Sequence, residues 1–297
     1  MRKFEIVSDS SCDLSEALIR QYEIDTVSFY VSFDDEHYYR EGKEISADAF
    51  YQTMVDQPNV FPKTSMPTLA DYMAAFEPLV EQGRPVLCIC LNAAFSGSYQ
   101  AAVNARTMVM EEYPEAEIRV IDSQLATVLQ GALVQEAVRL RDEGVELEEA
   151  AQRLEAVRST GRIFFTTNDL KYLAHGGRIG KAAAATGTIL QMKPMIELYN
   201  AELNSAGIVR GRKKSLQRFQ EMFREYVEKE QIDLNEYVIV TGYGYDYSEY
   251  EMINEQVAAM LADMGIAWEK PCDFHIGVTI GVHTGPHPIG MAIMRRA

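Results

Sequence analysis

The stretch that most constrains the fold is residues 86–102, which read V-L-C-I-C-L-N-A-A-F-S-G-S-Y-Q-A-A. Its first part, residues 86–91, is a continuous apolar run that begins after the turn residues Gly83 and Pro85. A run of this length is short for a helix and is typical of a strand buried on both faces. A polar loop follows, and residues 99–110 then have the spacing of a helix. We therefore expect a strand, a loop containing serine and glycine, and a helix, in that order.

Ser96 lies where this loop meets the helix, so its side-chain oxygen is expected to cap the first helical turn. Gly97 has no side chain, which lets a ligand approach the backbone N–H groups closely. Unpaired N–H donors and the helix dipole converge at such a junction, which favours an anion. The simpler alternative is that Ser96 only caps the helix.

The first half of the chain alternates predicted strands and helices. Ser46 and Thr68 are predicted helix caps, and Asp13 with Glu16 resembles a capping box. Such alternation predicts a parallel α/β sheet, whose ligand crevice lies beyond the carboxyl ends of the strands. The polar residues 8–11, Ser96 and residues 122–123 are expected to meet at that edge. Strands are predicted at residues 4–7, 26–33, 86–91 and 118–121, and helices at residues 16–22, 46–55, 68–83, 99–110, about twenty residues ending at 144, and 147–159.

The pattern changes after Gly161, where helices are interspersed with hairpin-like strands. We expect an α/β protein of two domains: residues 1–160 as a three-layer α/β domain with a parallel sheet, and residues 161–297 as an α+β domain with a mixed sheet. Strands are predicted at residues 162–166, 195–198, 203–209, 237–241, 266–272, 275–282 and 289–294, and helices at residues 170–173, 216–230 and 250–264, with one more after the glycine-rich turn at residues 176–180.

Charge and composition exclude several classes of partner. The net charge of −16 disfavours binding to nucleic acid or to an anionic membrane surface. No apolar run approaches the roughly 18 residues of a membrane span. The chain starts directly on a strand pattern without a signal-peptide segment, and its four cysteines are scattered. These features predict a cytoplasmic protein with reduced thiols.

Familiar catalytic motifs are absent from the sequence. Ser96 lacks the flanking glycines of a nucleophile elbow, and there is no P-loop. His283 and His287 are four residues apart, but Gly285, Pro286 and Pro288 prevent the helix that would pair them at a metal ion. We therefore predict no catalytic residue, no metal ligand and no cofactor.

Three turn motifs carry groups suited to binding. Thr64 and Ser65 lie between two prolines and are predicted to present hydroxyls on a stiff loop. Arg178 follows two glycines on a turn, and His283 follows a strand-like run. Each motif also has an ordinary structural interpretation: turn chemistry, a surface arginine and a satisfied core histidine.

Taken together, the motifs resemble a known family. In order, the chain contains D-S-S-C-D-L, K-T-S-M-P, S-G-S-Y-Q-A-A, D-S-Q, L-A-H-G-G-R-I-G-K-A-A-A, K-P-M-I, G-R-K-K and H-T-G-P. This series resembles the DegV family of bacterial fatty-acid-binding proteins, whose kinase-partnered members are called FakB. The chain departs from the family pattern at His287, where glycine is usual, and at Pro288 after it. Ser98 replaces the more common threonine, and Met66 the more common glutamine.

The resemblance implies that a fatty acid lies in an apolar tunnel with its carboxylate at the domain junction. It implies that Thr64 and Ser96, with Ser65 beside them, bind the carboxylate, and that His283 and Arg178 complete the polar end. About 14 buried methylenes at about 0.8 kcal/mol each would contribute on the order of 11 kcal/mol before the costs of association. The tail would then supply affinity and the head group orientation.

Two function classes follow from these observations. The first is a carrier, not an enzyme, that presents a long-chain fatty acid to a separate fatty acid kinase for acyl-phosphate formation. The second is a stand-alone phosphotransferase or hydrolase acting on a small acyl or hydroxy-ketone substrate. A kinase would need a nucleotide cradle, which the sequence lacks, and a hydrolase would need a base beside Ser96, for which only His283 qualifies. The carrier is the favoured interpretation.

Overall fold

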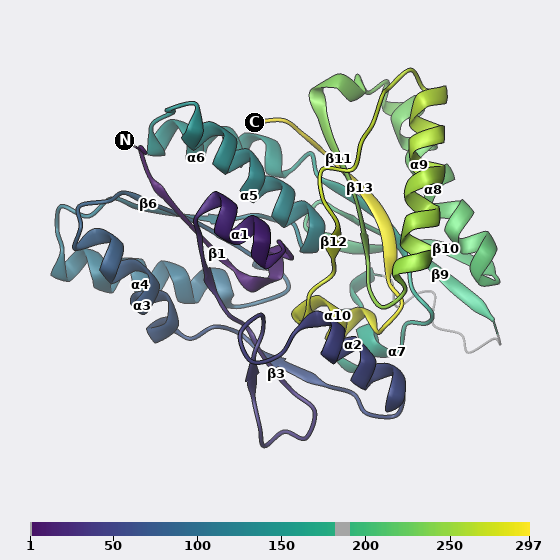
Figure 1. The fold of residues 1–297 in the computed structure, drawn as a ribbon, viewed down its shortest axis with the longest axis horizontal. Helices are drawn as coiled ribbons and strands as arrows, with labels where there is room; N and C mark the ends of the chain where they lie inside the picture. The colour runs from purple at the N-terminus through teal and green to yellow at the C-terminus, as the bar shows by residue number, and fades with distance from the viewer. Residues whose placement is uncertain (1, 182–190) are drawn as a thin grey trace.

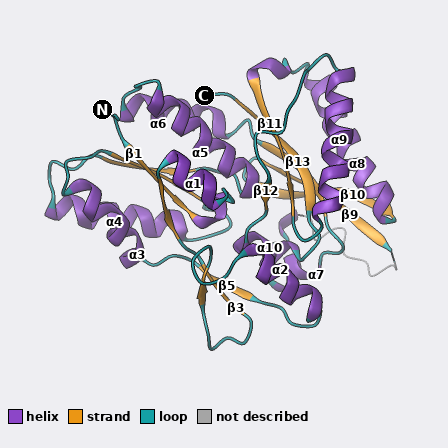
Figure 2. Cartoon of the chain, viewed as in Figure 1, coloured by secondary structure: helices purple, strands orange, loops and turns teal. Residues whose placement is uncertain are grey.

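The computed structural model describes residues 2–181 and 191–297. It contains a parallel sheet and a mixed sheet, each with helices on its faces, so the predicted α/β class is confirmed (Figures 1 and 2). The helix predicted after Gly180 falls mainly on residues 182–190, outside the described residues.

The parallel sheet has the order β2-β1-β6-β7. Every residue of the central strand β6 is buried, as its continuous apolar run predicts. All three pairings in the sheet are parallel, so the polar segments after β1, β6 and β7 leave from the same edge. The strands are β1 (Glu5–Asp9), β2 (Ile24–Val27), β6 (Val86–Cys90) and β7 (Ile118–Asp122).

Helices cover both faces of this sheet. Cys88 and Cys90 of β6 pack in a cluster with α3 and α4, whereas Leu87 and Ile89 pack in a second cluster with α5 and α6. This alternation along one strand builds the predicted three layers. The helices are α3 (Leu69–Val80), α4 (Ser98–Glu112), α5 (Thr127–Asp142) and α6 (Leu147–Arg158).

The mixed sheet has the order β10-β9-β8-β13-β11-β12, and only β11 and β12 pair in parallel. The amphipathic helices α8 (Arg212–Glu230) and α9 (Tyr247–Asp263) cover its outer face with a separate apolar cluster. The strands are β8 (Arg162–Thr166), β9 (Met192–Tyr199), β10 (Glu202–Arg210), β11 (Tyr237–Tyr243), β12 (Phe274–His275) and β13 (Ile289–Arg295).

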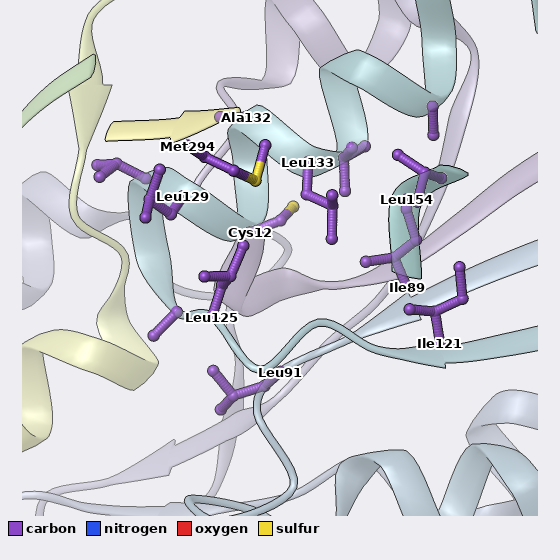
Figure 3. Packing of buried hydrophobic residues seen from close by; sticks show 14 of the residues in the cluster. Cys12, Ile89, Leu91, Ile121, Leu125, Leu129, Ala132, Leu133, Leu154 and Met294 are labelled. Carbon is purple, nitrogen blue, oxygen red and sulfur yellow. The ribbon is translucent and has the colours of Figure 1, made fainter. Parts of the chain in front are cut away.

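Helices α5 and α6 pack against both sheets and join the two halves (Figure 1). Figure 3 shows Leu133 of α5 in the same cluster as Ile89 of β6 and Met294 of β13. One apolar core therefore spans the change from one sheet to the other, and the division at residues 160 and 161 stays a prediction.

A third, small sheet with the order β4-β3-β5 lies beside helices α2 and α10 (Figure 2). It brings the segment around Thr64 next to the C-terminal half, because β5 and α10 are in contact. The elements are β3 (Tyr30–Ser32), β4 (Tyr39–Arg40), β5 (Lys63–Ser65), α2 (Ala47–Asp56) and α10 (Val278–Thr284). The remaining short elements are η1 (Ser10–Cys12), α1 (Glu16–Tyr22), α7 (Lys171–His175) and η3 (Leu234–Glu236).

Several local predictions are wrong. The strand predicted at 275–282 is mostly the helix α10. The buried carboxylate of Glu41 accepts a hydrogen bond from a backbone N–H of its first turn, and the apolar residues of the helix pack against neighbouring elements. Residues 266–272 form no strand; Trp268 instead donates a side-chain hydrogen bond to the Ile239 carbonyl. The strand predicted at 26–33 is divided between β2 and β3, which belong to different sheets.

The predicted helix starts have mixed outcomes. Ser46 and Thr68 cap α2 and α3 as predicted, and Thr68 forms a full capping box with Asp71. The capping box predicted for Asp13 is wrong, because Ser15 caps α1 and Asp13 adopts a left-handed conformation instead.

Candidate functional site

A cavity of about 300 Å³ opens where the carboxyl edge of the parallel sheet meets the mixed sheet. Its floor comes from the inner face of the mixed sheet, and its walls come from the loop after β6, the start of α5, and α10. Most of the lining is apolar, which suits a hydrocarbon ligand. The lining includes Leu91, Phe95, Ile163, Phe165, Leu198 and Leu203.

The five residues predicted to bind a ligand all line this cavity: Thr64, Ser65, Ser96, Arg178 and His283. They come from four separate parts of the chain, so the fold assembles the group. Their individual roles in binding remain predictions.

Thr64 and Ser65 lie on β5 and not on the predicted proline-stiffened loop. This strand pairs with β3, where Thr64 stands opposite Val31. The strand pairing with β3 fixes the backbone here, whereas the sequence predicted that the two flanking prolines would fix it.

His283 lies in the last turn of α10, beside Thr64. Its Nε2 atom is 3.3 Å from Thr64 Oγ1, and its buried Nδ1 atom has no hydrogen-bond partner among the described residues. Burial, with a smaller contribution from the Arg178 guanidinium, lowers the pKa of His283 to about 4. The imidazole is therefore neutral at neutral pH.

The close packing around His283 depends on Gly176. A Cβ atom at Gly176 would stand only 2.1 Å from His283 Nδ1. The glycine in this turn thus leaves room for the imidazole ring, a function that the sequence motif alone does not reveal.

Ser96 lies at the start of α4, although Gly97 and not Ser96 occupies the N-cap position. The Ser98 backbone N–H donates to Ser96 Oγ over 3.1 Å, so the hydroxyl does bond the first helical residue. Met66 covers this turn, since a Cβ at Gly97 would be 2.7 Å from its sulfur.

Arg178 lies at the exposed end of the site. Its guanidinium donates to the Phe95 carbonyl over 3.2 Å and to the Gly176 carbonyl over 2.6 Å. Within the described ranges no carboxylate pairs with Arg178. Among the described lining residues, only Arg178 carries a positive charge at neutral pH.

Asp9, one of the polar residues predicted to meet at the carboxyl edge of the sheet, belongs to a buried network that holds the loop after β6. Asp9 is fully buried at the end of β1 and accepts hydrogen bonds from the Leu91 N–H at 2.9 Å and from Ser98 Oγ at 2.8 Å. Gln130 of α5 donates to its other oxygen over 2.7 Å. Burial raises the pKa of Asp9, while these bonds act in the opposite direction. The arrangement fixes both ends of the loop that carries Ser96.

Two further buried acids, Asp13 and Glu41, were not predicted from the sequence to support the site. Thr127 Oγ1 donates to Asp13, and Thr279 Oγ1 donates to Glu41 over 2.6 Å. Both threonines line the cavity. Local sequence pattern does not reveal these hydrogen bonds, because the partners of Asp13 and Glu41 are 114 and 238 residues away.

No group of three or more histidine, cysteine or acidic side chains placed to hold a metal ion occurs in residues 2–181 and 191–297. His283 and His287 do not share a helix, since α10 ends at Thr284. His287 instead packs edge-on against Tyr245, with ring centroids 5.9 Å apart. None of the helices in the described part of the chain is long and apolar enough to cross a membrane.

Comparison with known proteins identifies the family. The sequence profile described as "Uncharacterised protein, DegV family" matches residues 3–296. The chain belongs to the DegV family. Curated relatives agree: a DegV domain-containing protein of Clostridium perfringens is 31% identical over 287 residues, which cover 96% of this chain and 95% of the relative.

Solved structures of DegV proteins share the fold. A stearic acid-binding protein from Eubacterium ventriosum is 40% identical, with a TM-score of 0.93 over 99% of this chain and 98% of that one. A DegV family protein from Thermus thermophilus, described by its fatty acid binding, is 28% identical with a TM-score of 0.85 over 99% of this chain and 100% of that one. The neighbours of this DegV chain therefore include proteins that bind fatty acids.

Proposed function

We propose that this DegV protein binds a long-chain fatty acid, with the acyl chain in the apolar cavity and the carboxylate at its polar end. The observation that carries the proposal is the cavity itself, whose mostly apolar lining also contains Thr64, Ser96 and His283. Fatty-acid binding by the related Eubacterium ventriosum and Thermus thermophilus proteins supports it.

The apolar walls suit the tail. A methylene group gains about 0.8 kcal/mol on leaving water, so a long chain gains more from this cavity than a short acid would. The side chains that would contact the tail come from both sheets, for example Leu91 after β6 and Phe165 on β8. Affinity then depends on chain length, and both halves of the protein contribute to it.

The polar end suits a carboxylate held by neutral donors. A carboxylate that leaves water must be hydrogen-bonded, and the hydroxyls of Thr64, Ser65 and Ser96 are available donors on the cavity wall. His283 is neutral here and offers a single N–H. The ligand is bound without a direct buried ion pair, and Arg178 remains at the entrance.

The exposed position of Arg178 supports a second part of the proposal, that the bound acid is presented to a separate fatty acid kinase. A permanently charged guanidinium at the entrance suits a phosphate that arrives from outside. The protein is then the substrate-presenting subunit of a kinase system and not a catalyst itself. Its partners are the fatty acid and the kinase.

A hydrolase is the weaker alternative on physical grounds. A general base works best with a pKa near the operating pH, and the pKa of His283 lies at about 4. Its Nε2 atom also faces Thr64 and not Ser96. A serine nucleophile at Ser96 would therefore lack an effective base.

Mass spectrometry of lipid extracted from the freshly purified protein tests the binding proposal. We expect about one long-chain fatty acid per chain, and saturable binding of added palmitic acid after lipid removal. Absence of acyl chains together with no binding of added fatty acid would overturn it.

A further inference from the structure

Two buried carboxyl groups, those of Asp13 and Glu41, meet behind the cavity wall. Each residue is only 6% exposed. A Cβ atom on Gly277 would lie 2.4 Å from Asp13 Oδ1 and 2.6 Å from Glu41 Oε1, so both oxygens converge on one backbone position. Within residues 2–181 and 191–297, neither carboxyl forms an ion pair with a lysine, arginine or histidine. Burying two such groups together is unfavourable unless each is hydrogen-bonded.

Glu41 holds the first turn of α10. Its Oε1 atom accepts a hydrogen bond from the Thr279 backbone N–H at 2.9 Å, and its Oε2 atom accepts from Thr279 Oγ1 at 2.6 Å. Ser10 donates to the same carboxylate over 2.6 Å. A residue of the first half of the chain thus fixes the helix that carries His283.

Asp13 holds the start of α5 in a comparable way. It accepts a hydrogen bond from Oγ1 of Thr127, the first residue of that helix. Thr127 has a φ of 50°, a left-handed conformation that β-branched residues rarely adopt. Such a conformation persists only where its surroundings enforce it, and Asp13 supplies the bond that does so.

Burial disfavours a negative charge on Asp13 and on Glu41. The titratable groups that face it are Asp9, Cys12, Tyr51 and the other member of the pair. Burial, with the neighbouring Glu41 carboxylate, raises the pKa of Asp13 well above its usual value, and burial also raises the pKa of Glu41. Burial thus disfavours the charged form of both carboxyl groups.

We propose that Asp13 and Glu41 are positioning residues of the binding site, which set the starts of α5 and α10 and, through α10, the place of His283 beside Thr64. This inference rests on the proposed function, because it assigns the pair to the head-group end of the same cavity. The two acids do not line the cavity and act through Thr127 and Thr279.

The test compares a ligand that has a carboxylate with one that lacks it. Glu41→Ala is expected to weaken palmitic acid binding about tenfold, the effect of one lost hydrogen bond to a charged group. It should change the affinity for cetyl alcohol, which has the same chain length, by less than about twofold, because the apolar walls remain. Glu41→Gln keeps an acceptor for the Thr279 N–H and should restore part of the lost affinity. Glu136→Ala, which removes an equally buried glutamate on α5 outside the cavity lining, is the control and should affect both ligands alike.

Gly277→Ala provides a second variant in case Glu41→Ala does not fold. Gly277 has an ordinary φ of −72°, so alanine strains no backbone and only displaces the two carboxyl groups. It should reproduce the selective loss of palmitic acid binding. Equal losses for acid and alcohol in both variants, or parent-like palmitic acid binding in a folded variant, would overturn the inference.

A measurement without any ligand separates the two proposals. The imidazole proton resonance of His283 is expected to titrate at higher pH in Glu41→Ala than in the parent, since a displaced α10 exposes the ring. An unchanged titration would contradict the inference even if the parent binds fatty acid. A parent that binds no fatty acid, with the titration shifted as expected, would instead overturn the proposed function alone.

Discussion

Thr64 Oγ1 lies 3.3 Å from Nε2 of His283, although 219 residues separate them along the chain. One belongs to a short strand of the first half and the other to the last turn of α10. The pair places a hydroxyl and a neutral imidazole side by side on the wall of a mostly apolar cavity.

Removing a single hydroxyl should weaken binding without unfolding the protein. Thr64→Ala and Ser96→Ala are each expected to reduce fatty-acid affinity by about 1 to 3 kcal/mol, the range for a hydrogen bond to a charged group. Isothermal titration with palmitic acid measures the effect. Thr107→Ala, which alters an exposed hydroxyl on α4 outside the cavity lining, is the matched control. Parent-like affinity in both site variants would place the carboxylate elsewhere.

The low pKa of His283 should make stability depend on pH. The unfolded imidazole gains its proton near pH 6.5 and the folded one only at about pH 4, so the unfolded state binds more protons between these values. The unfolding free energy of the parent is therefore expected to fall by about 2 kcal/mol between about pH 7 and about pH 5 on account of this group.

Urea denaturation of the parent and of His283→Gln at both pH values measures that contribution. The glutamine variant lacks the titrating group and should lose correspondingly less stability on acidification. Equal losses in the two proteins would show that His283 titrates normally in the folded state.

Two glycine substitutions near the site should differ in effect. Gly176→Ala places a methyl group against the confined ring of His283, which costs about 1 to 3 kcal/mol of stability at an overpacked site, and the displaced ring should weaken ligand binding. Gly97→Ala meets the sulfur of Met66, a flexible and partly exposed side chain that can move away. Affinity measurements on the two variants check this order, and a larger loss for Gly97→Ala would contradict it.

Arg178 and His283 should matter more for turnover with a kinase than for lipid affinity. Arg178→Ala and His283→Ala are each expected to reduce acyl-phosphate formation by a larger factor than they reduce fatty-acid binding, because both residues lie at the head-group end. Lipid titration and kinase-coupled turnover, measured on the same samples, provide the comparison. Proportional losses in both quantities would mean that the two residues only hold the lipid.

The sequence predicted best what depends on local pattern. The apolar run of β6 predicted a strand buried on both faces, and Ser46 and Thr68 marked true helix starts. The membership of Thr64, Ser96 and His283 in one site came from the order of motifs along the chain and not from any spacing between them. Local sequence pattern does not predict which residues of separate helices and strands come together in space.

What the sequence did not predict depends on tertiary contacts. The segment 275–282 is rich in β-branched and apolar residues, which predicts a strand. Glu41, far away in the sequence, instead accepts a hydrogen bond from its backbone and holds the first turn of the helix α10 there. The burial of Asp13 and Glu41 could not be predicted from local pattern, because acidic residues are usually exposed. The left-handed φ of Thr127 is equally unexpected for a β-branched residue.

The middle layer of α5 and α6 has a consequence for how a ligand can enter and leave. A hinge motion that moved the two sheets apart would separate apolar side chains such as Leu133 and Met294 and expose both to water. Such opening amounts to partial unfolding of the molecule, so the halves cannot separate like the lobes of a clamp. Under the proposed function, a long acyl chain would instead exchange through local movements at the cavity rim, where Met66 is exposed beside Gly97.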